Sequence, residues 1–144
     1  MVKKMIIIVL LIFINTARAA ELSATSDDEF ELNYQIEEEF DKCVKDDAKN
    51  YSTRMMNCYY DAADAWEKEI DRLFKLSLKE QKDETIKSAL IMKQKSWVKY
   101  KEAYFKALDK IYTLQEVGTA ELTVSASIKM NFLLNKAAEF TESY

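Results

Sequence analysis

The sequence predicts an all-α protein: an antiparallel helical bundle of about four helices, with one disulfide joining the first two. The 144 residues contain no proline and a single glycine, which is poor material for the turns of a β-rich fold. Apolar residues recur three and four positions apart over long stretches, as they do in amphipathic helices. Cys43 and Cys58 are the only cysteines, and they form an even pair.

Residues 1–19 have the three parts of a secretory signal peptide. Lys3 and Lys4 form a basic start, residues 5–14 are an unbroken apolar run, and Ala17 and Ala19 frame a small-x-small cleavage site. A membrane anchor is the alternative, but it needs about 18 to 20 apolar residues. No cysteine near the cleavage site could carry a lipid. We therefore expect a mature protein that is periplasmic or secreted, with no membrane-spanning segment.

The mature chain is acidic and has the length of one domain. Removing the three basic residues of 1–19 leaves 18 basic against 25 acidic residues, a net charge of −7. This balance argues against nucleic acid and anionic membrane and is compatible with a basic protein partner. We expect residues 20–28 to form a loose leader and residues 29–144 to form a single helical domain. The sequence does not indicate an oligomeric state.

The first helix is predicted from Glu29 to about Asp47, although its apolar pattern is uneven. Eight acidic residues and no basic one lie between Asp27 and Asp41. The simpler interpretation is a solvated acidic face. The alternative is a face that steers a cationic partner electrostatically, with these candidate residues: Glu37, Glu38, Glu39 and Asp41.

Three more helices are predicted. The second starts near Ser52 or Thr53, and Trp66, Ile70 and Phe74 continue its apolar series. Residues 79–83 favour a turn over a continued helix, because one helix over 53–112 would have no core to pack into. The third helix is expected over 84–114. Gly118 suits a left-handed helix end and Thr119 an N-cap, so the fourth helix follows them.

The cysteines most simply form a disulfide that joins the first hairpin, because exported proteins mature in oxidising compartments. The chain-entropy model gives such a loop roughly 3 kcal/mol of stabilisation. Two free thiols or a metal pair are the alternatives. The chain has no histidine, so the two cysteines make a poor zinc site. No metal and no cofactor is predicted.

The residues available for catalysis are few. The absence of histidine removes the ordinary nucleophile pairs and the Glu-x-x-His motif of di-iron bundles. No glycine-rich phosphate loop is present. We therefore predict that the protein is not an enzyme. Trp66, Trp97, Tyr100 and Tyr104 could line a ligand pocket, but at helical spacing aromatic side chains more often form core. We favour core, with Trp97 buried against Trp66.

Besides the cysteines, ten spaced residues form a recognisable pattern, and we expect them to be core: Met55, Ala62, Ile70, Asp71, Phe74, Gln94, Trp97, Tyr100, Lys101 and Ala103. This pattern resembles the signature of the LprI-type lysozyme inhibitor domain, a family of small exported helical bacterial proteins. Asp71 and Lys101 depart from the family pattern, where Asn and Arg are usual. The second cysteine pair that many members carry is absent here.

The resemblance implies a binding protein that blocks a peptidoglycan-degrading enzyme, such as a cationic lysozyme. Two alternatives stay open. One is an immunity protein against a secreted wall-degrading effector, which would differ only in its target. The other is a structural or chaperone-like adaptor of the envelope, because exposed aromatic and methionine side chains can bind other chains.

Overall fold

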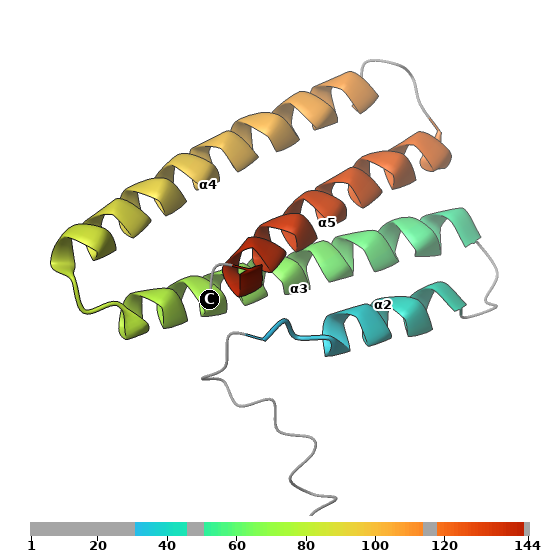
Figure 1. Ribbon diagram of the computed structural model, residues 1–144. Helices are drawn as coiled ribbons and strands as arrows, with labels where there is room; N and C mark the ends of the chain where they lie inside the picture. Colours follow the sequence, from blue (N-terminus) through green and yellow to red (C-terminus); the bar gives the residue numbers. More distant parts are fainter. Residues whose placement is uncertain (1–30, 46–50, 114–117, 143–144) are drawn as a thin grey trace, which may run out of the picture.

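A computed structural model describes residues 31–45, 51–113 and 118–142 of the chain. Within them lie four α-helices: α2 (Gln35–Lys45), α3 (Tyr51–Glu80), α4 (Glu84–Thr113) and α5 (Thr119–Glu142). Consecutive helices are antiparallel and these ranges contain no strand, so the predicted all-α bundle is confirmed (Figure 1). The predicted signal peptide and leader lie outside the described residues. No helix in these ranges combines the length and apolarity that crossing a membrane requires.

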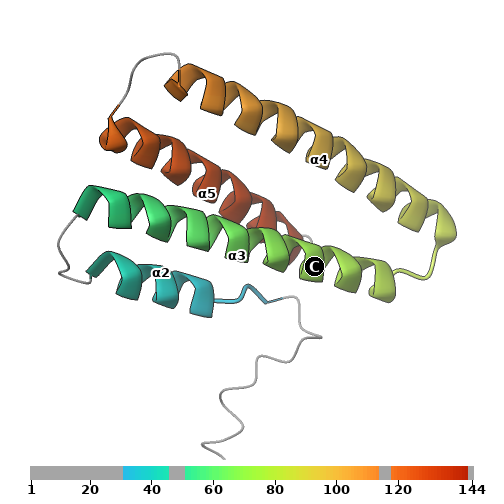
Figure 2. The ribbon, with the colours of Figure 1, turned by 180° about the vertical axis from the view of Figure 1, so that it is seen from behind.

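The helices are arranged in space in the order α2, α3, α5, α4. The α3 and α5 helices run in the same direction and form the closest pair, while α2 lies against α3 on one side and α4 lies on the other (Figures 1 and 2). Small residues allow the central pair to approach, because α3 buries Ala62 and Ala63 and α5 buries Ala126 and Ala137. The α4 helix is therefore peripheral.

The core lies between α2, α3 and α5. Its buried residues are Ile36, Ala62, Ala63, Trp66, Ile70, Leu73, Met130, Leu133 and Ala137. The α4 helix adds none of these. Its Trp97 and Phe105 only pack against the cluster, and Leu108 is its one buried apolar residue. The core therefore depends on the α3–α5 pair, and much of α4 remains accessible.

The predicted disulfide is present. Cys43 near the end of α2 is bonded to Cys58 in the second turn of α3, with 5.8 Å between the Cα atoms. The α2 helix itself begins later than predicted, at Gln35 instead of Glu29. The side-chain Oδ1 of Asn33 accepts a hydrogen bond from the backbone N–H of Gln35 (3.2 Å). Asn33 therefore lies outside the helix and caps its N-terminus.

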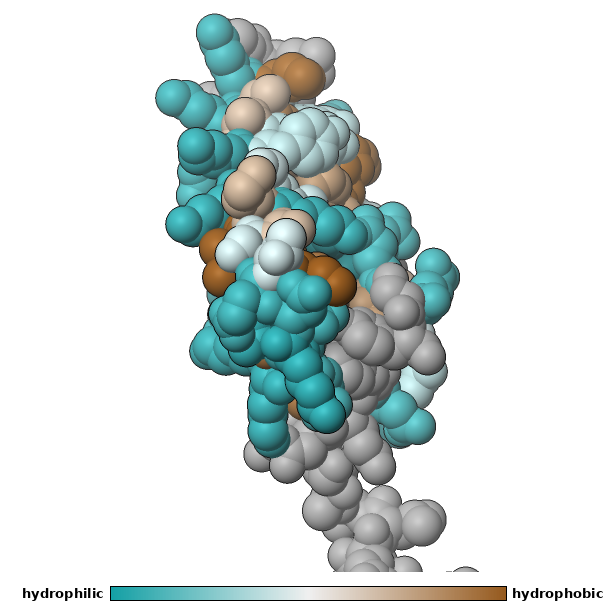
Figure 3. Space-filling view, turned by 60° about the vertical axis from the view of Figure 1, so that its left-hand side comes forward, coloured by the Kyte–Doolittle hydropathy of each residue, from teal (hydrophilic) through white to brown (hydrophobic). Residues whose placement is uncertain are grey.

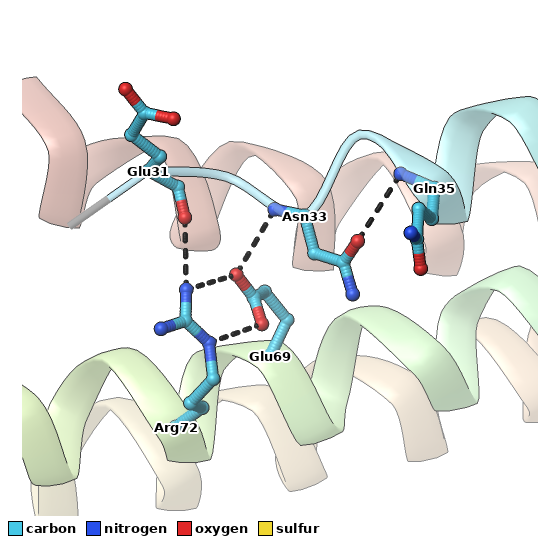
Figure 4. A network of polar contacts seen from close by, with 5 residues as sticks. All are labelled: Glu31, Asn33, Gln35, Glu69 and Arg72. Carbon is cyan, nitrogen blue, oxygen red and sulfur yellow. Dashed lines mark hydrogen bonds and ion pairs between the residues drawn. The ribbon is translucent and has the colours of Figure 1, made fainter. Parts of the chain in front are cut away.

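A buried ion pair fixes the segment before α2 onto α3 (Figure 4). The carboxylate of Glu69, only 4% exposed, accepts two hydrogen bonds from the Arg72 guanidinium, each 2.8 Å long. Glu69 also accepts the backbone N–H of Asn33 (3.1 Å), and Arg72 donates to the carbonyl of Glu31 (2.8 Å). These contacts satisfy the buried charge and hold residues 31–33 against α3.

The turn between α3 and α4 lies where it was predicted, over residues 81–83. Asp83 caps α4, because its Oδ1 accepts the backbone N–H groups of Thr85 (2.7 Å) and Ile86 (3.2 Å). At the next helix start, Gly118 and not Thr119 occupies the N-cap position: its carbonyl accepts the N–H of Leu122 at 3.4 Å. Gly118 does not adopt the left-handed conformation that was expected.

Candidate functional site

A groove between α3 and α4 gathers half of the ten signature residues. The volume of the groove is about 530 Å³, and Ile70 and Asp71 of α3 face Gln94, Trp97 and Lys101 of α4 across it. We call it the signature groove. Its remaining lining residues are Asp64, Glu67, Lys68, Val98 and Glu102. The groove forms because α4 packs only loosely against α3, so side chains of both helices line the space between them.

Trp97 forms the centre of this groove wall. Its ring stacks on Phe132 of α5, with ring centroids 5.9 Å apart and ring planes 11° from parallel. Two lysine ammonium groups lie over the indole, that of Lys101 at 5.8 Å from the centroid and that of Lys136 at 5.5 Å. Lys101 also forms an ion pair with Glu67 of α3. Three side chains, those of Phe132, Lys101 and Lys136, therefore lie against the Trp97 ring.

The expectation that the signature residues are core is wrong for three of them, which are exposed. Ala62 and Ile70 are buried, whereas Met55, Phe74, Gln94, Trp97 and Lys101 are half-buried. Asp71 and Ala103 are exposed, and Tyr100 is 59% exposed. The reason is the peripheral position of α4, which carries five of the ten. Trp66 is core as expected, but the ring stacked on Trp97 is that of Phe132.

The formal charges lining the signature groove favour a cation. Four carboxylates line it, those of Asp64, Glu67, Asp71 and Glu102, against the two ammonium groups of Lys68 and Lys101. In the part of the chain that the structure describes, no group of histidine, cysteine or carboxylate side chains could hold a metal ion.

The four acidic residues predicted to steer a partner are all exposed on α2. Glu37, Glu38 and Asp41 line a second groove of about 500 Å³, which has Trp66, Met130 and Leu134 among its apolar lining residues. Ion pairs along α2 reduce this charge: Lys42 lies 3.9 Å from Glu38, and Lys45 lies 2.7 Å from Asp41. Glu37 and Glu39 form no ion pair with a residue in the described ranges.

Sequence reasoning missed Phe132. This ring lies within 6 Å of four aromatic rings of α4, at centroid distances of 5.2 Å to Tyr104, 5.5 Å to Phe105 and 5.9 Å to both Trp97 and Tyr100. The sequence does contain a signal for it. Phe132 is a large aromatic residue close in sequence to the core residues Met130 and Leu133, but it projects from a different side of the last helix. Such a residue indicates a second packing surface.

The chain was compared with known protein families, curated proteins and solved structures. Residues 43–140, about two thirds of the chain, match the family described as Lysozyme inhibitor LprI. The chain belongs to the LprI lysozyme inhibitor family. Curated proteins and solved structures gave no match. The matched LprI region contains the whole signature groove and begins at Cys43, so the four acidic residues of α2 precede it.

Proposed function

We propose that the protein is exported and that it binds and inhibits a peptidoglycan-degrading enzyme of the lysozyme class. Membership of the LprI family carries this proposal. The signature groove is the proposed contact surface, because it lies within the family match and brings together Asp71, Gln94 and Trp97 from two helices. The proposed compartment is the periplasm or the exterior, after removal of residues 1–19.

The charge of the groove supports a cationic target. With four carboxylates against two ammonium groups, the groove carries a formal charge of −2. Arginine and lysine side chains of an enzyme surface could pair with Asp64 and Glu102, while Trp97 supplies apolar contact area. Partly desolvated pairs of this kind contribute mainly to specificity and to a slow dissociation rate.

The acidic residues of α2 have a different proposed role. They are exposed, and α2 lies on the other side of the α3–α5 pair from α4. Charges at that distance from the contact surface act through the long-range field, so they accelerate association and their effect is screened by salt. We therefore assign steering to Glu37 and Glu39 and direct contact to the groove.

Inhibition by binding requires no chemistry from this protein. Lysozyme-class enzymes hydrolyse glycosidic bonds with their own pair of carboxylic acids. A helical body docked over the substrate cleft would exclude the glycan strand and leave these acids intact. An immunity protein against a wall-degrading effector would act in the same way on a different enzyme.

The primary test is a lysozyme activity assay with the oxidised mature protein at low and at physiological salt. Inhibition of a cationic lysozyme that weakens as salt increases is the expected result. If several lysozyme types retain full activity at low salt, lysozyme inhibition is excluded. A wall-degrading effector then becomes the next target to assay.

Charge-reversal variants separate contact from steering. Asp64→Lys combined with Glu102→Lys should raise the inhibition constant at least tenfold, mainly through faster dissociation. Glu37→Lys combined with Glu39→Lys should slow association, and only at low salt. A matched control is Glu121→Lys with Glu142→Lys, two exposed residues at the ends of α5. If all three double variants change inhibition equally, the interaction depends only on the net charge of the protein, and the groove is excluded as the contact surface.

A further inference from the structure

A small pocket lies near the end of the bundle that carries the α3–α4 turn. Residues of three helices line it, among them Phe74 and Ser77 of α3, Leu90 of α4 and Phe140 of α5. Its volume is about 60 Å³. A buried water needs about 10–15 Å³ of such volume, so the pocket has room for a few waters or for one small chemical group. Seen from the side of the turn, this end of the molecule is mainly hydrophilic and is interrupted by small apolar patches (Figure 3).

A buried lysine of α5 lines this pocket, which we call the Lys136 pocket. Lys136 is only 5% exposed. Its Nζ atom lies 5.5 Å from the ring centroid of Trp97 and 5.4 Å from that of Phe140. The faces of these rings attract positive charge, so they stabilise the ammonium group there. Neither ring supplies an oxygen acceptor, so the ammonium group still requires hydrogen-bond partners.

The ammonium group of Lys136 has more hydrogen-bond donors than partners in the protein. A lysine ammonium group carries three N–H donors. Among the described residues it has one acceptor, the Oε2 atom of Glu139 at 2.7 Å. A charge that is removed from bulk water is well stabilised only when its remaining donors are also satisfied. The other donors of this buried cation are therefore available to an oxygen acceptor in the pocket.

Two polar side chains of α4 complete the lining. Lys93 is exposed and forms no ion pair with a described residue. The side-chain amide of Gln94 is half-buried and forms no hydrogen bond within the same ranges. Lys93 and Lys136 against Glu139 give the pocket a formal charge of +1. The signature groove, which shares Gln94, has a formal charge of −2, so these two neighbouring sites favour ligands of opposite charge.

We propose that the Lys136 pocket binds the carboxylate of a small apolar acid. The carboxylate accepts hydrogen bonds from the side chains of Lys136, Lys93 and Gln94. The apolar part of the acid packs on Leu90 and Phe140. Nothing in this inference depends on lysozyme inhibition.

A carboxylate fits this pocket better than a phosphate group does. The carboxylate of Glu139 already accepts a hydrogen bond from Lys136, so the geometry for one carboxylate at this ammonium group is present. Phosphate groups are bulkier and are typically bound by the planar fork of arginine, and no arginine lines the pocket. The apolar side chains of Phe74, Leu90 and Phe140 also favour an acid that carries a hydrocarbon group.

Glu139 is an internal competitor of the proposed ligand. Its side chain is 55% exposed, and it lies one turn after Lys136 on the same helix. Its carboxylate takes one donor of the ammonium group and lowers the positive charge of the pocket. Removal of this charge should therefore strengthen the binding of an added acid. A purely structural role of Glu139, in which it only positions Lys136, predicts the opposite result.

The test is a titration of the oxidised mature protein with butyrate, followed by the backbone amide signals of residues 90–94 and 136–140 in proton–nitrogen NMR spectra. We expect saturable shifts of these signals. Butyramide has nearly the same shape without the charge and should cause no shifts.

Three variants and a matched control assign the binding. Lys136→Met should weaken butyrate binding roughly tenfold, Lys93→Gln about threefold, and Glu139→Gln should strengthen it about threefold. The control is Lys129→Met. Lys129 also lies on α5, is 12% exposed, pairs with Asp109 and lies 5.5 Å from the centroid of an aromatic ring, but it does not line this pocket. Its replacement should change binding less than about twofold.

A second ligand pair distinguishes a free acid from the carboxyl end of a peptide. N-acetyl-alanyl-alanine is titrated beside its C-terminal amide. If the peptide acid binds more tightly than butyrate and its amide does not bind, the pocket serves the end of a peptide chain. If butyrate binds at least as tightly as the peptide acid, the ligand is a free acid. Both results support a carboxylate site.

Four results would overturn the proposal: no shifts with either acid, equal shifts with butyrate and butyramide, equal losses in Lys136→Met and Lys129→Met, or weaker binding in Glu139→Gln. Circular dichroism of each variant checks that it remains helical. If Lys136→Met does not fold, Lys93→Gln and Glu139→Gln decide, because both positions are exposed. Lysozyme inhibition is measured separately.

Discussion

Trp97 of α4 stacks on Phe132 of α5, and this contact is the centre of the attachment of α4 to the bundle. The two centroids are 5.9 Å apart. Tyr100, Tyr104 and Phe105 surround the same Phe132 ring, so one side chain of α5 anchors four of α4. The wall of the signature groove depends on this cluster, because α4 has little other buried apolar surface.

Phe132→Ala should lower the free energy of unfolding by about 2–3 kcal/mol, since it removes an anchor shared by four rings. Urea denaturation followed by tryptophan fluorescence measures the change. Tyr100→Ala is the control, because the Tyr100 side chain is mostly exposed and its loss should cost less than 1 kcal/mol. Equal losses in the two variants would contradict the anchoring role of Phe132.

The two tryptophans should differ in their contribution to stability. Trp66 is 1% exposed within the core, so Trp66→Ala should cost about 3–5 kcal/mol and leave little folded protein. Trp97 is half-buried, so Trp97→Ala should stay folded with a smaller loss of about 2 kcal/mol and should lose target binding. Circular dichroism and denaturation of both variants check this. Unfolding of both would restore the purely structural interpretation of Trp97.

Reduction of the Cys43–Cys58 disulfide should lower stability by about 3 kcal/mol, the value expected for a loop of 15 residues. The same loss is expected for Cys43→Ala combined with Cys58→Ala in oxidising conditions. Thermal denaturation with and without a reductant measures it. If the double variant is also sensitive to the reductant, the effect has another cause.

Removing one partner of the Glu69–Arg72 pair should be more harmful than removing both. Arg72→Met leaves the buried Glu69 carboxylate without its partner and should cost about 3 kcal/mol. Glu69→Met combined with Arg72→Met should recover part of that loss. Proteolysis of the segment before α2 reports the local effect, because Arg72 binds the carbonyl of Glu31. A double variant as unstable as Arg72→Met would contradict this.

Asp83 should make the start of α4 sensitive to acid. Hydrogen bonds from the backbone N–H groups of Ile86 and Thr85 lower the pKa of its carboxyl below the usual value. The folded state therefore binds this proton less readily than the unfolded state does. The stabilisation is complete above the unfolded pKa and is lost as pH falls through the lowered folded pKa.

Amide exchange at Thr85 and Ile86, measured against pH, tests this expectation. Protection should decrease on acidification in the unmodified protein. Asp83→Asn keeps a good N-cap but cannot titrate, so its protection should be independent of pH over the same range. A pH dependence that persists in Asp83→Asn would assign the effect to another group.

Two features of the fold were predicted correctly from the sequence. The turn at residues 81–83 was placed because one helix over 53–112 would have no core to pack into, and the disulfide followed from an even cysteine pair. The start of the first helix was misplaced, because contacts of Glu69 and Arg72 with residues 31–33 compete with helix formation there. Those partners are 36 and 41 positions apart in sequence, and a local pattern does not contain them.

The sequence by itself determined that the chain is helical, that its helices are joined by a disulfide and that it resembles the LprI family, because periodicity, cysteine parity and residue spacing are local properties. Only the tertiary structure decided which apolar stripes meet. Ala62 and Ala126 let α3 and α5 pair closely, and α4 was left at the edge. For this reason Trp97 and Lys101 line a groove instead of a core, and most of α4 is exposed.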